Sequence, residues 1–185
     1  MDIWGKCCGF LLRISGWTAV GVPAKEDKCI ILGVPHTTFL DFAVSYLYYR
    51  SFGEHAKIMI KKEFFVPPLG WLLRAMGGVP VDRTNPTTML RSIISEMERP
   101  GRFHLAIAPE GTRKPVRRWK TGFHLIARSA NVPVYLGFFD WGRKRVGKGE
   151  RFELSDDAAA DMKRIQEIYE GMQLKGKHPE NYLTH

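Results

Sequence analysis

The sequence is poor in cysteine and has no long hydrophobic run. Three cysteines, Cys7, Cys8 and Cys29, occur among its 185 residues, and none belongs to a C-x-x-C pair. An odd number of thiols with this spacing predicts neither a disulfide framework nor a zinc site, so we expect a reducing compartment. No stretch approaches the ~20 apolar residues that span a bilayer, and the charged N-terminus has no secretory signal pattern. We therefore expect a protein that is soluble or lies on a membrane rather than through it.

Acidic residues are also scarce relative to basic ones. The chain has 28 lysines and arginines against 19 aspartates and glutamates, a net charge of +9, with 44% hydrophobic and 25% charged residues. This composition excludes a disordered chain, a collagen-like fibre and a polytopic membrane protein. The positive charge predicts an anionic partner, which leaves nucleic acid, a lipid surface and a phosphorylated small molecule. Because no RNP-type aromatic strand or zinc-finger spacing occurs, we expect no nucleic-acid partner.

Short apolar runs alternate with helical patterns throughout residues 18–185. The strand patterns cover residues 29–34, 57–60, 79–81, 103–108 and 132–139. The helical patterns cover residues 39–50, 69–76, 87–98, 121–130 and 156–172. This alternation predicts the α/β fold class, a single layered domain with a mostly parallel or mixed central sheet flanked by helices. In such folds the functional groups gather in loops beyond the carboxyl ends of the strands.

Residues 1–17 add a short amphipathic helix before this domain. Its apolar positions recur at steps of four and three and therefore share one face. They are Ile3, Cys7, Phe10, Ile14 and Trp17. One interpretation is a helix that covers the core. The other is an interfacial helix that lies on a membrane, with Trp4 and Trp17 as its aromatic anchors.

The first candidate functional pair is His36 and Asp41, which follow the strand pattern at 29–34. Because Pro35 and two threonines favour a helix start after His36, the histidine can lie in a turn while Asp41 reaches back to its ring. A carboxylate on one ring nitrogen fixes the tautomer and leaves the other nitrogen able to accept a proton. The alternative is structural, because Thr38 and Asp41 also resemble a capping box at the helix N-terminus.

A second group of candidate residues follows the strand pattern at 103–108. It comprises Glu110, Gly111, Thr112 and Arg113. These residue types offer a sharp turn, a hydroxyl and a guanidinium suited to phosphate. Five basic residues against one acidic residue between 110 and 121 favour an anion site, while a solvated basic loop is the alternative. A third segment, from Lys62 to Arg83, surrounds an apolar, proline-stiffened stretch with charge, which suits an amphiphilic substrate.

These segments together resemble the lysophospholipid acyltransferase family, the group of 1-acyl-sn-glycerol-3-phosphate acyltransferases. The family's H-x-x-x-x-D motif matches His36 and Asp41, and its E-G-T-R motif matches residues 110–113 without a gap. Its second motif matches residues 62–83, and its proline within an apolar strand matches residues 132–135. The four matches follow the family's order and span most of the chain.

The resemblance implies direct acyl transfer without an acyl-enzyme, which agrees with the absence of a G-x-S-x-G motif. In this interpretation His36 is the general base and Asp41 orients it. The implied acceptor-binding residues are Glu110, Gly111, Thr112, Arg113, Arg83 and Lys62. For Glu110 the resemblance leaves two roles, holding the turn or binding the acceptor through a polar contact. Neither a metal nor a cofactor is implied, because acyl-CoA or acyl-carrier protein serves as the acyl-donor substrate.

The resemblance also implies the partners and the location of the protein. The acceptor would be a lysophospholipid, with 1-acyl-glycerol-3-phosphate giving phosphatidic acid. The protein would be peripheral, at the cytoplasmic face of an anionic membrane surface, which a basic cluster at residues 143–151 could face. Two other functions remain open, an acyl thioesterase or hydrolase that uses the same His–Asp pair and a non-catalytic basic lipid-binding module.

Overall fold

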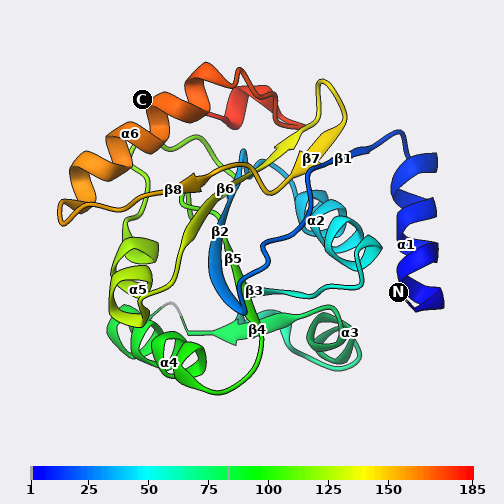
Figure 1. Cartoon of the computed structure of the whole chain (residues 1–185), viewed down its shortest axis with the longest axis horizontal. Coiled ribbons are helices and arrows are strands. Elements are labelled where there is room, and N and C mark those ends of the chain that lie inside the picture. The colour runs from blue at the N-terminus through cyan, green and yellow to red at the C-terminus, as the bar shows by residue number, and fades with distance from the viewer. Residues whose placement is uncertain (1, 83) are drawn as a thin grey trace.

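The computed structural model describes residues 2–82 and 84–185, and these residues form one eight-stranded sheet with helices on both faces (Figure 1). The strand order is β1-β7-β6-β2-β5-β3-β4, and β8 also pairs with β6. The strands are β1 (Thr18–Val20), β2 (Lys28–Val34), β3 (Ala56–Lys61), β4 (Gly78–Val81), β5 (Phe103–Ile107), β6 (Val134–Asp140), β7 (Arg145–Gly147) and β8 (Arg151–Phe152). The helices are α1 (Ile3–Ile14), α2 (Leu40–Ser51), α3 (Leu69–Ala75), α4 (Pro86–Glu98), α5 (Gly122–Ala130) and α6 (Ala158–Gly171), with short 3-10 turns η1 (Lys62–Phe64) and η2 (Pro179–Asn181).

The sheet is parallel through its centre and antiparallel only around β7 and β8. Strands β6, β2, β5, β3 and β4 pair in parallel, in that order. Both β7 and β8 run antiparallel to β6, and β1 pairs in parallel with β7. The predicted α/β class with a mostly parallel or mixed sheet is therefore confirmed, and each predicted strand and helix is present within three residues of its expected ends.

The connections place the strand ends that carry His36 and Glu110 beside each other. The chain leaves β2 through α2 toward β3 and leaves β5 through α5 toward β6, in opposite directions along the sheet. Because parallel crossovers are right-handed, α2 and α5 lie on opposite faces, as Figure 1 shows. Neighbouring strands whose chains diverge in this way leave a crevice beyond their carboxyl ends, where α/β proteins bind ligands.

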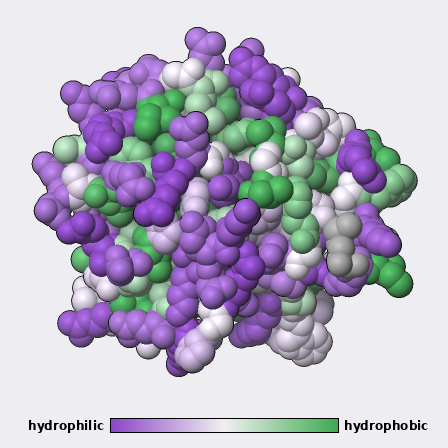
Figure 2. All heavy atoms as spheres, viewed as in Figure 1, coloured by the Kyte–Doolittle hydropathy of each residue, from purple (hydrophilic) through white to green (hydrophobic). Residues whose placement is uncertain are grey.

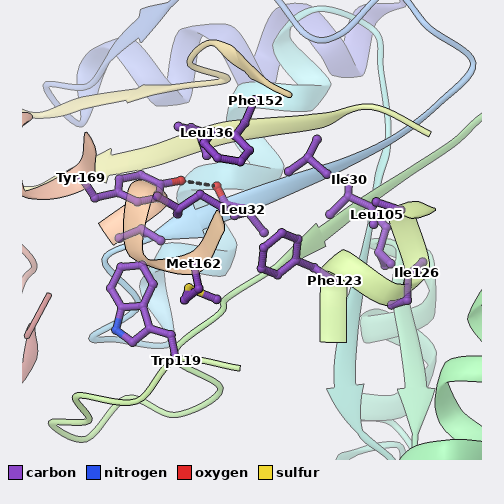
Figure 3. Close-up of a cluster of buried hydrophobic side chains, with 14 of the residues drawn as sticks. Ile30, Leu32, Leu105, Trp119, Phe123, Ile126, Leu136, Phe152, Met162 and Tyr169 are labelled. Atoms are coloured by element: carbon purple, nitrogen blue, oxygen red, sulfur yellow. Dashed lines mark hydrogen bonds between the residues drawn. The ribbon is translucent and has the colours of Figure 1, made fainter. Parts of the chain in front are cut away.

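Alternate residues of β2 supply two separate hydrophobic cores. Ile30, Leu32 and Val34 pack with residues of α4, α5 and α6 in the larger core, part of which appears in Figure 3. Cys29 and Ile31 face the other way, into the core beneath α2. A strand buried on both faces explains why residues 29–34 form a continuous apolar run rather than an alternating one.

Helix α1 packs against α2 and turns its most apolar face outward. Its buried residues are Gly5, Cys8 and Leu12, whereas Ile3 and Phe10 are 82% and 55% exposed. Figure 2 shows hydrophobic residues on the right-hand rim of the molecule, where α1 lies in Figure 1. None of the helices in residues 2–82 and 84–185 is long and apolar enough to cross a membrane.

The expected helix at residues 3–17 is too long by three residues, and Trp17 does not belong to its outer face. The helix ends at Ile14, where the Ser15 and Gly16 amides donate to Leu11 and Arg13 carbonyls. Trp17 is 4% exposed, so the prediction that it anchors an interfacial helix is wrong. The indole packs edge-on against another tryptophan ring instead, which favours burial over exposure of so large an apolar group.

Candidate active site

His36 and Asp41 form a hydrogen-bonded pair at the carboxyl end of β2. His36 lies in the turn between β2 and α2, and Asp41 lies in the first turn of α2. Nδ1 of His36 is 3.2 Å from Oδ2 of Asp41. The imidazole is 29% exposed, whereas the carboxylate is 1% exposed. The other ring nitrogen, Nε2, makes no hydrogen bond to any described residue and can accept a proton from a bound substrate.

The Asp41 carboxylate is held by backbone as well as by side chains. Oδ2 accepts hydrogen bonds from the Thr37 and Thr38 amides at 2.9 and 3.0 Å. These amides lie just before α2, whose N-cap residue Phe39 receives no side-chain capping bond, so the carboxylate fixes the turn that leads into the helix. The His36 contact and the reach of Asp41 back to Thr38 therefore share one carboxylate oxygen. Oδ1 accepts from Nε1 of Trp141, at 2.7 Å.

Glu110 supports the same turn from the neighbouring strand, and we name residues 35–38 the His36 turn. Glu110 follows β5, and its Oε1 accepts a hydrogen bond from the His36 amide at 2.8 Å. The side chain is 6% exposed. Burial raises the pKa of Glu110 to about 7, against the opposing effect of the His36 amide and the histidine charge. Its carboxyl therefore holds the backbone of the His36 turn, which is one of the two roles expected for it from the sequence.

Gly111, Thr112 and Arg113 continue the loop beyond β5. Gly111 has a φ of +67°, a left-handed conformation that disfavours side chains, and its amide donates to the Ala108 carbonyl at 3.0 Å. Oγ1 of Thr112 accepts from the Lys114 amide at 3.2 Å. The Arg113 side chain is exposed. The loop thus has the sharp turn expected from the sequence and leaves a guanidinium in solvent at the carboxyl edge of the sheet.

Lys62 does not present an unengaged ammonium group to a substrate. It follows β3 at the same edge of the sheet, and its Nζ is 2.5 Å from Oδ2 of Asp82. This contact raises the pKa of Lys62, and the ammonium with the Thr84 donors holds the pKa of Asp82 below its usual range. The predicted phosphate contact by Lys62 would therefore share the ammonium with Asp82, through its remaining N–H donors. Arg83 lies outside the described residues.

Most of the basic cluster at 143–151 is engaged within the fold. Arg143 and Arg145 lie 3.2 and 3.4 Å from the buried Asp140 carboxylate. Nζ of Lys148 lies 4.0 Å from the centre of the Tyr135 ring. These contacts stabilise the fold around β6. They leave fewer unpaired cations to bind a lipid headgroup or another anionic ligand than the sequence alone suggests.

Trp141 is the residue near the dyad that the sequence analysis did not identify. It occupies the turn after β6, and β6 pairs with β2 so that Phe138 lies beside Val34. The sequence feature that could identify Trp141 is its position directly after a strand of the parallel sheet, where functional residues collect. The basic cluster that follows it at residues 143–151 is instead typical of an exposed surface loop.

The site is a histidine–aspartate dyad with a buried glutamate behind it. Such a dyad can remove a proton from a hydroxyl or a water molecule that approaches Nε2. Among the described residues, no group of three or more His, Cys, Asp or Glu side chains is placed to hold a metal ion. The fold and the site together define a doubly wound α/β protein with a hydrogen-bonded histidine–aspartate pair at the carboxyl edge of its sheet.

The sequence profile of the Acyltransferase family matches residues 22–135, which include both His36 and Glu110. This match covers more than half of the chain, so the chain belongs to the Acyltransferase family. The resemblance found in the sequence motifs is thereby confirmed. The matched region contains β2, α2 and β5, the elements that assemble the dyad and its buried support.

Named relatives agree with this family. The 1-acyl-sn-glycerol-3-phosphate acyltransferases of Pseudomonas aeruginosa and Streptococcus pneumoniae are 30% and 32% identical over 59% and 60% of this chain. A chloroplastic 1-acyl-sn-glycerol-3-phosphate acyltransferase of Brassica napus is 30% identical over 61%. The matched regions span 43%, 41% and 33% of those proteins, less than half of each.

A solved structure supports the fold. The crystal structure of the 1-acyl-sn-glycerophosphate acyltransferase PlsC from Thermotoga maritima superposes with a TM-score of 0.59. The superposition covers 94% of this chain and 81% of that one, at 17% sequence identity. The likeness extends beyond the family match at residues 22–135 and includes nearly the whole described chain.

Proposed function

We propose that this protein transfers a fatty acyl group to the hydroxyl of a lysophospholipid, with 1-acyl-glycerol-3-phosphate as acceptor and phosphatidic acid as product. One observation carries the proposal, the 3.2 Å contact between His36 Nδ1 and the buried Asp41 carboxylate, with Nε2 left for substrate. Family membership directs this base toward acyl transfer, and the names of the relatives suggest the acceptor.

The reaction follows from the positions of the two side chains. Nε2 of His36 accepts the proton of the acceptor hydroxyl, and Asp41 stabilises the imidazolium that forms. The oxygen attacks the thioester carbonyl of acyl-CoA or acyl-carrier protein, a C–O bond forms and the C–S bond breaks. The leaving thiolate takes the proton back from the imidazolium. No covalent enzyme intermediate, cofactor or metal takes part in this sequence.

Acceptor phosphate binding is assigned to the loop after β5. Arg113 offers an exposed, planar guanidinium there, and Gly111 and Thr112 shape the turn before it. Lys62 would contribute through the N–H donors that its contact with Asp82 leaves over. Glu110 would act by holding the His36 turn, since its carboxyl is buried against the His36 amide.

We also propose an anionic membrane surface as partner, with the protein bound peripherally at the cytoplasmic face. Two exposed apolar side chains, Phe39 and Leu40, directly follow the His36 turn. Further exposed apolar side chains occur on α1 and between residues 64 and 72, with Trp71 67% exposed. Exposed apolar side chains in these segments suit insertion into a membrane surface, and the net charge of +9 favours anionic lipid.

The deciding experiment follows both products of the reaction. Purified protein is incubated with acyl-CoA or acyl-carrier protein and a panel of lysolipids, and free thiol and esterified lipid are both quantified. We expect equal amounts of thiol and esterified product, highest with a phosphorylated glycerolipid. His36→Ala should lower the rate by about 10²–10⁴-fold, the usual contribution of a general base.

The same assay separates the alternatives. Thiol release without esterified lipid would indicate a thioesterase or hydrolase, and vesicle binding without either product would indicate a lipid-binding module. His185→Ala is the matched control, because that exposed histidine pairs with Glu170 away from the dyad. Full acyl transfer by His36→Ala would refute the proposed mechanism.

A further inference from the structure

We propose that Trp141 is a positioning residue for the His36–Asp41 dyad, an inference that rests on the proposed role of His36 as general base. Nε1 of the indole donates a hydrogen bond of 2.7 Å to Oδ1 of Asp41. The two residues are 100 positions apart in the sequence and meet because β6 pairs with β2. Trp141 does not belong to any motif that identified the site.

The two oxygens of Asp41 have different partners, and this division gives Trp141 its role. Oδ2 receives the His36 ring and two backbone amides, those of Thr37 and Thr38. Among the described residues, only Trp141 donates to Oδ1. Rotation of the carboxylate about its Cβ–Cγ bond would move both oxygens, so a donor at Oδ1 adds to the restraint that the contacts at Oδ2 impose. The indole N–H thereby helps to keep a lone pair of Oδ2 directed toward Nδ1 of His36.

The indole is itself held in place by three other segments. Its ring lies edge-on to Trp17, with ring centres 4.9 Å apart. The ammonium groups of Lys144 and Lys177 lie 4.7 and 5.1 Å from the centre of the indole. The Trp141 amide donates to the Lys175 carbonyl at 2.8 Å. A donor fixed in this way loses little entropy when it binds the carboxylate, which is the requirement for preorganisation.

The turn that carries Trp141 is also tied down. Oδ1 of the buried Asp140 accepts from the Arg143 amide at 3.1 Å, and its Oδ2 contacts the Arg143 and Arg145 side chains. The arginines at 143 and 145 therefore help to hold the turn that positions the indole, and they do so without contacting the dyad. This gives a local reason for a basic cluster that the proposed reaction does not otherwise use.

The test is a double-mutant cycle on the purified enzyme. Trp141→Phe removes the N–H donor and keeps an aromatic ring. We expect kcat to fall about 10- to 100-fold while KM changes by less than about twofold, because the substrate contacts remain. In an Asp41→Ala background the same substitution should change kcat by less than about twofold, since no carboxylate remains to be oriented. Equal losses in both backgrounds would overturn the proposal.

Trp119→Phe is the matched control, because that buried indole donates to a backbone carbonyl, that of Leu183, at 3.1 Å. It loses the same kind of hydrogen bond, and we expect a similar loss of thermal stability with kcat within about twofold of the parent. A kcat loss as large as that of Trp141→Phe would show that general destabilisation explains both variants. Benzothienylalanine at position 141 keeps the shape of the indole without the N–H and should reproduce the Phe variant.

A measurement that needs no turnover separates this proposal from the proposed function. The proton on His36 Nδ1 should give a low-field NMR signal, assigned by its absence in His36→Ala. In Trp141→Phe that signal should move upfield or broaden as the hydrogen bond to Asp41 loosens. An unchanged signal would refute the positioning role even if acyl transfer is found. A changed signal in a protein without acyl transfer would leave the positioning role standing and refute the function.

Discussion

The buried carboxyl of Glu110 couples protonation to the geometry of the His36 turn. Burial raises its pKa from 4.5 to about 7, so the folded state favours the neutral acid. The groups that act on it are His36 and Asp41, and its own charge acts on the phenols of Tyr169 and Tyr182. Because the folded pKa exceeds the unfolded one, the stabilisation is complete below about pH 4.5 and is lost as pH rises to about 7.

Glu110→Gln should remove this pH dependence. The amide oxygen can still accept the hydrogen bond from the His36 amide, but the side chain no longer ionises. We expect the free energy of unfolding of the variant, relative to the parent, to rise by up to about 3 kcal/mol between pH 4.5 and pH 8. Urea titrations across this range measure the difference. Parallel pH profiles for parent and variant would contradict the assignment.

Glu63→Gln is an informative control because the sign is reversed. Hydrogen bonding to its own backbone amide lowers the pKa of this exposed carboxyl. Its contribution to stability is therefore present above the unfolded pKa and is lost as pH falls. Relative to the parent, the Glu63 variant should become less stable as pH rises, in the opposite direction to the Glu110 variant.

At the residue level, contacts between residues close together in the sequence could be predicted, whereas contacts between distant residues could not. His36 and Asp41 are five residues apart, and a proline before them showed where the helix begins, so their contact could be predicted. Trp141 meets the same carboxylate only through the pairing of β6 with β2, which no local pattern encodes. Lys62 could be proposed from its residue type, but its partner Asp82 follows the neighbouring strand β4, and their ion pair depends on the pairing of β3 with β4.

Helix α1 differs from a core helix because most of its large apolar side chains face away from the fold. Its buried side consists of small residues and one leucine against α2, while Ile3, Phe10 and Ile14 are exposed. The exposed Lys6 and Arg13 flank this face. An apolar face with flanking cations is the arrangement by which helices lie in a lipid headgroup layer.

Replacing Ile3, Phe10 and Ile14 by serine together should weaken membrane binding without unfolding the protein. The three side chains make little contact with the fold, so we expect a small change in melting temperature. Binding to vesicles that contain phosphatidylglycerol should fall at least about tenfold, because each apolar side chain contributes on insertion. Co-sedimentation with vesicles measures the partition.

The chain offers a matched control on the opposite face of the sheet. Leu125 on α5 and Ile168 on α6 are also exposed apolar residues, 52% and 43%. Serine at both positions removes a smaller exposed apolar area, from the other face, and should leave vesicle binding within about twofold of the parent. Equal losses in the two sets would indicate nonspecific adsorption rather than an oriented face.

Helices and strands could be predicted where the pattern of apolar residues extends over enough positions to show a period. The helices from α2 to α6 and the five central strands were predicted because their apolar residues repeat or run continuously. The two- and three-residue strands β1, β7 and β8 have no such pattern. Strands β7 and β8 form on the edge of β6, and β1 forms on β7. For α1, periodicity placed Ile3, Phe10 and Ile14 on one face but wrongly added the buried Trp17. It also did not show whether this face meets the core or the surface, because the pattern does not say what a face contacts.

At the scale of the whole molecule, α6 joins the C-terminal part of the chain to the centre of the sheet. Tyr169 on α6 is completely buried, and its hydroxyl lies 3.2 Å from the Leu32 carbonyl and 2.9 Å from the Gly137 carbonyl (Figure 3). These carbonyls belong to β2 and β6, the strands that carry His36 and Trp141. One phenol therefore links the last helix to both halves of the site.

Tyr169→Phe should lower the free energy of unfolding by about 1–2 kcal/mol, because it removes a buried donor from two carbonyls. Tyr182→Phe is the matched comparison. Its hydroxyl oxygen is also buried but has no hydrogen-bond partner among the described residues, so its loss should be neutral or slightly stabilising. Urea unfolding of both variants measures the difference. Equal destabilisation would mean that the ring environment, rather than the bridge between β2 and β6, determines the contribution of Tyr169.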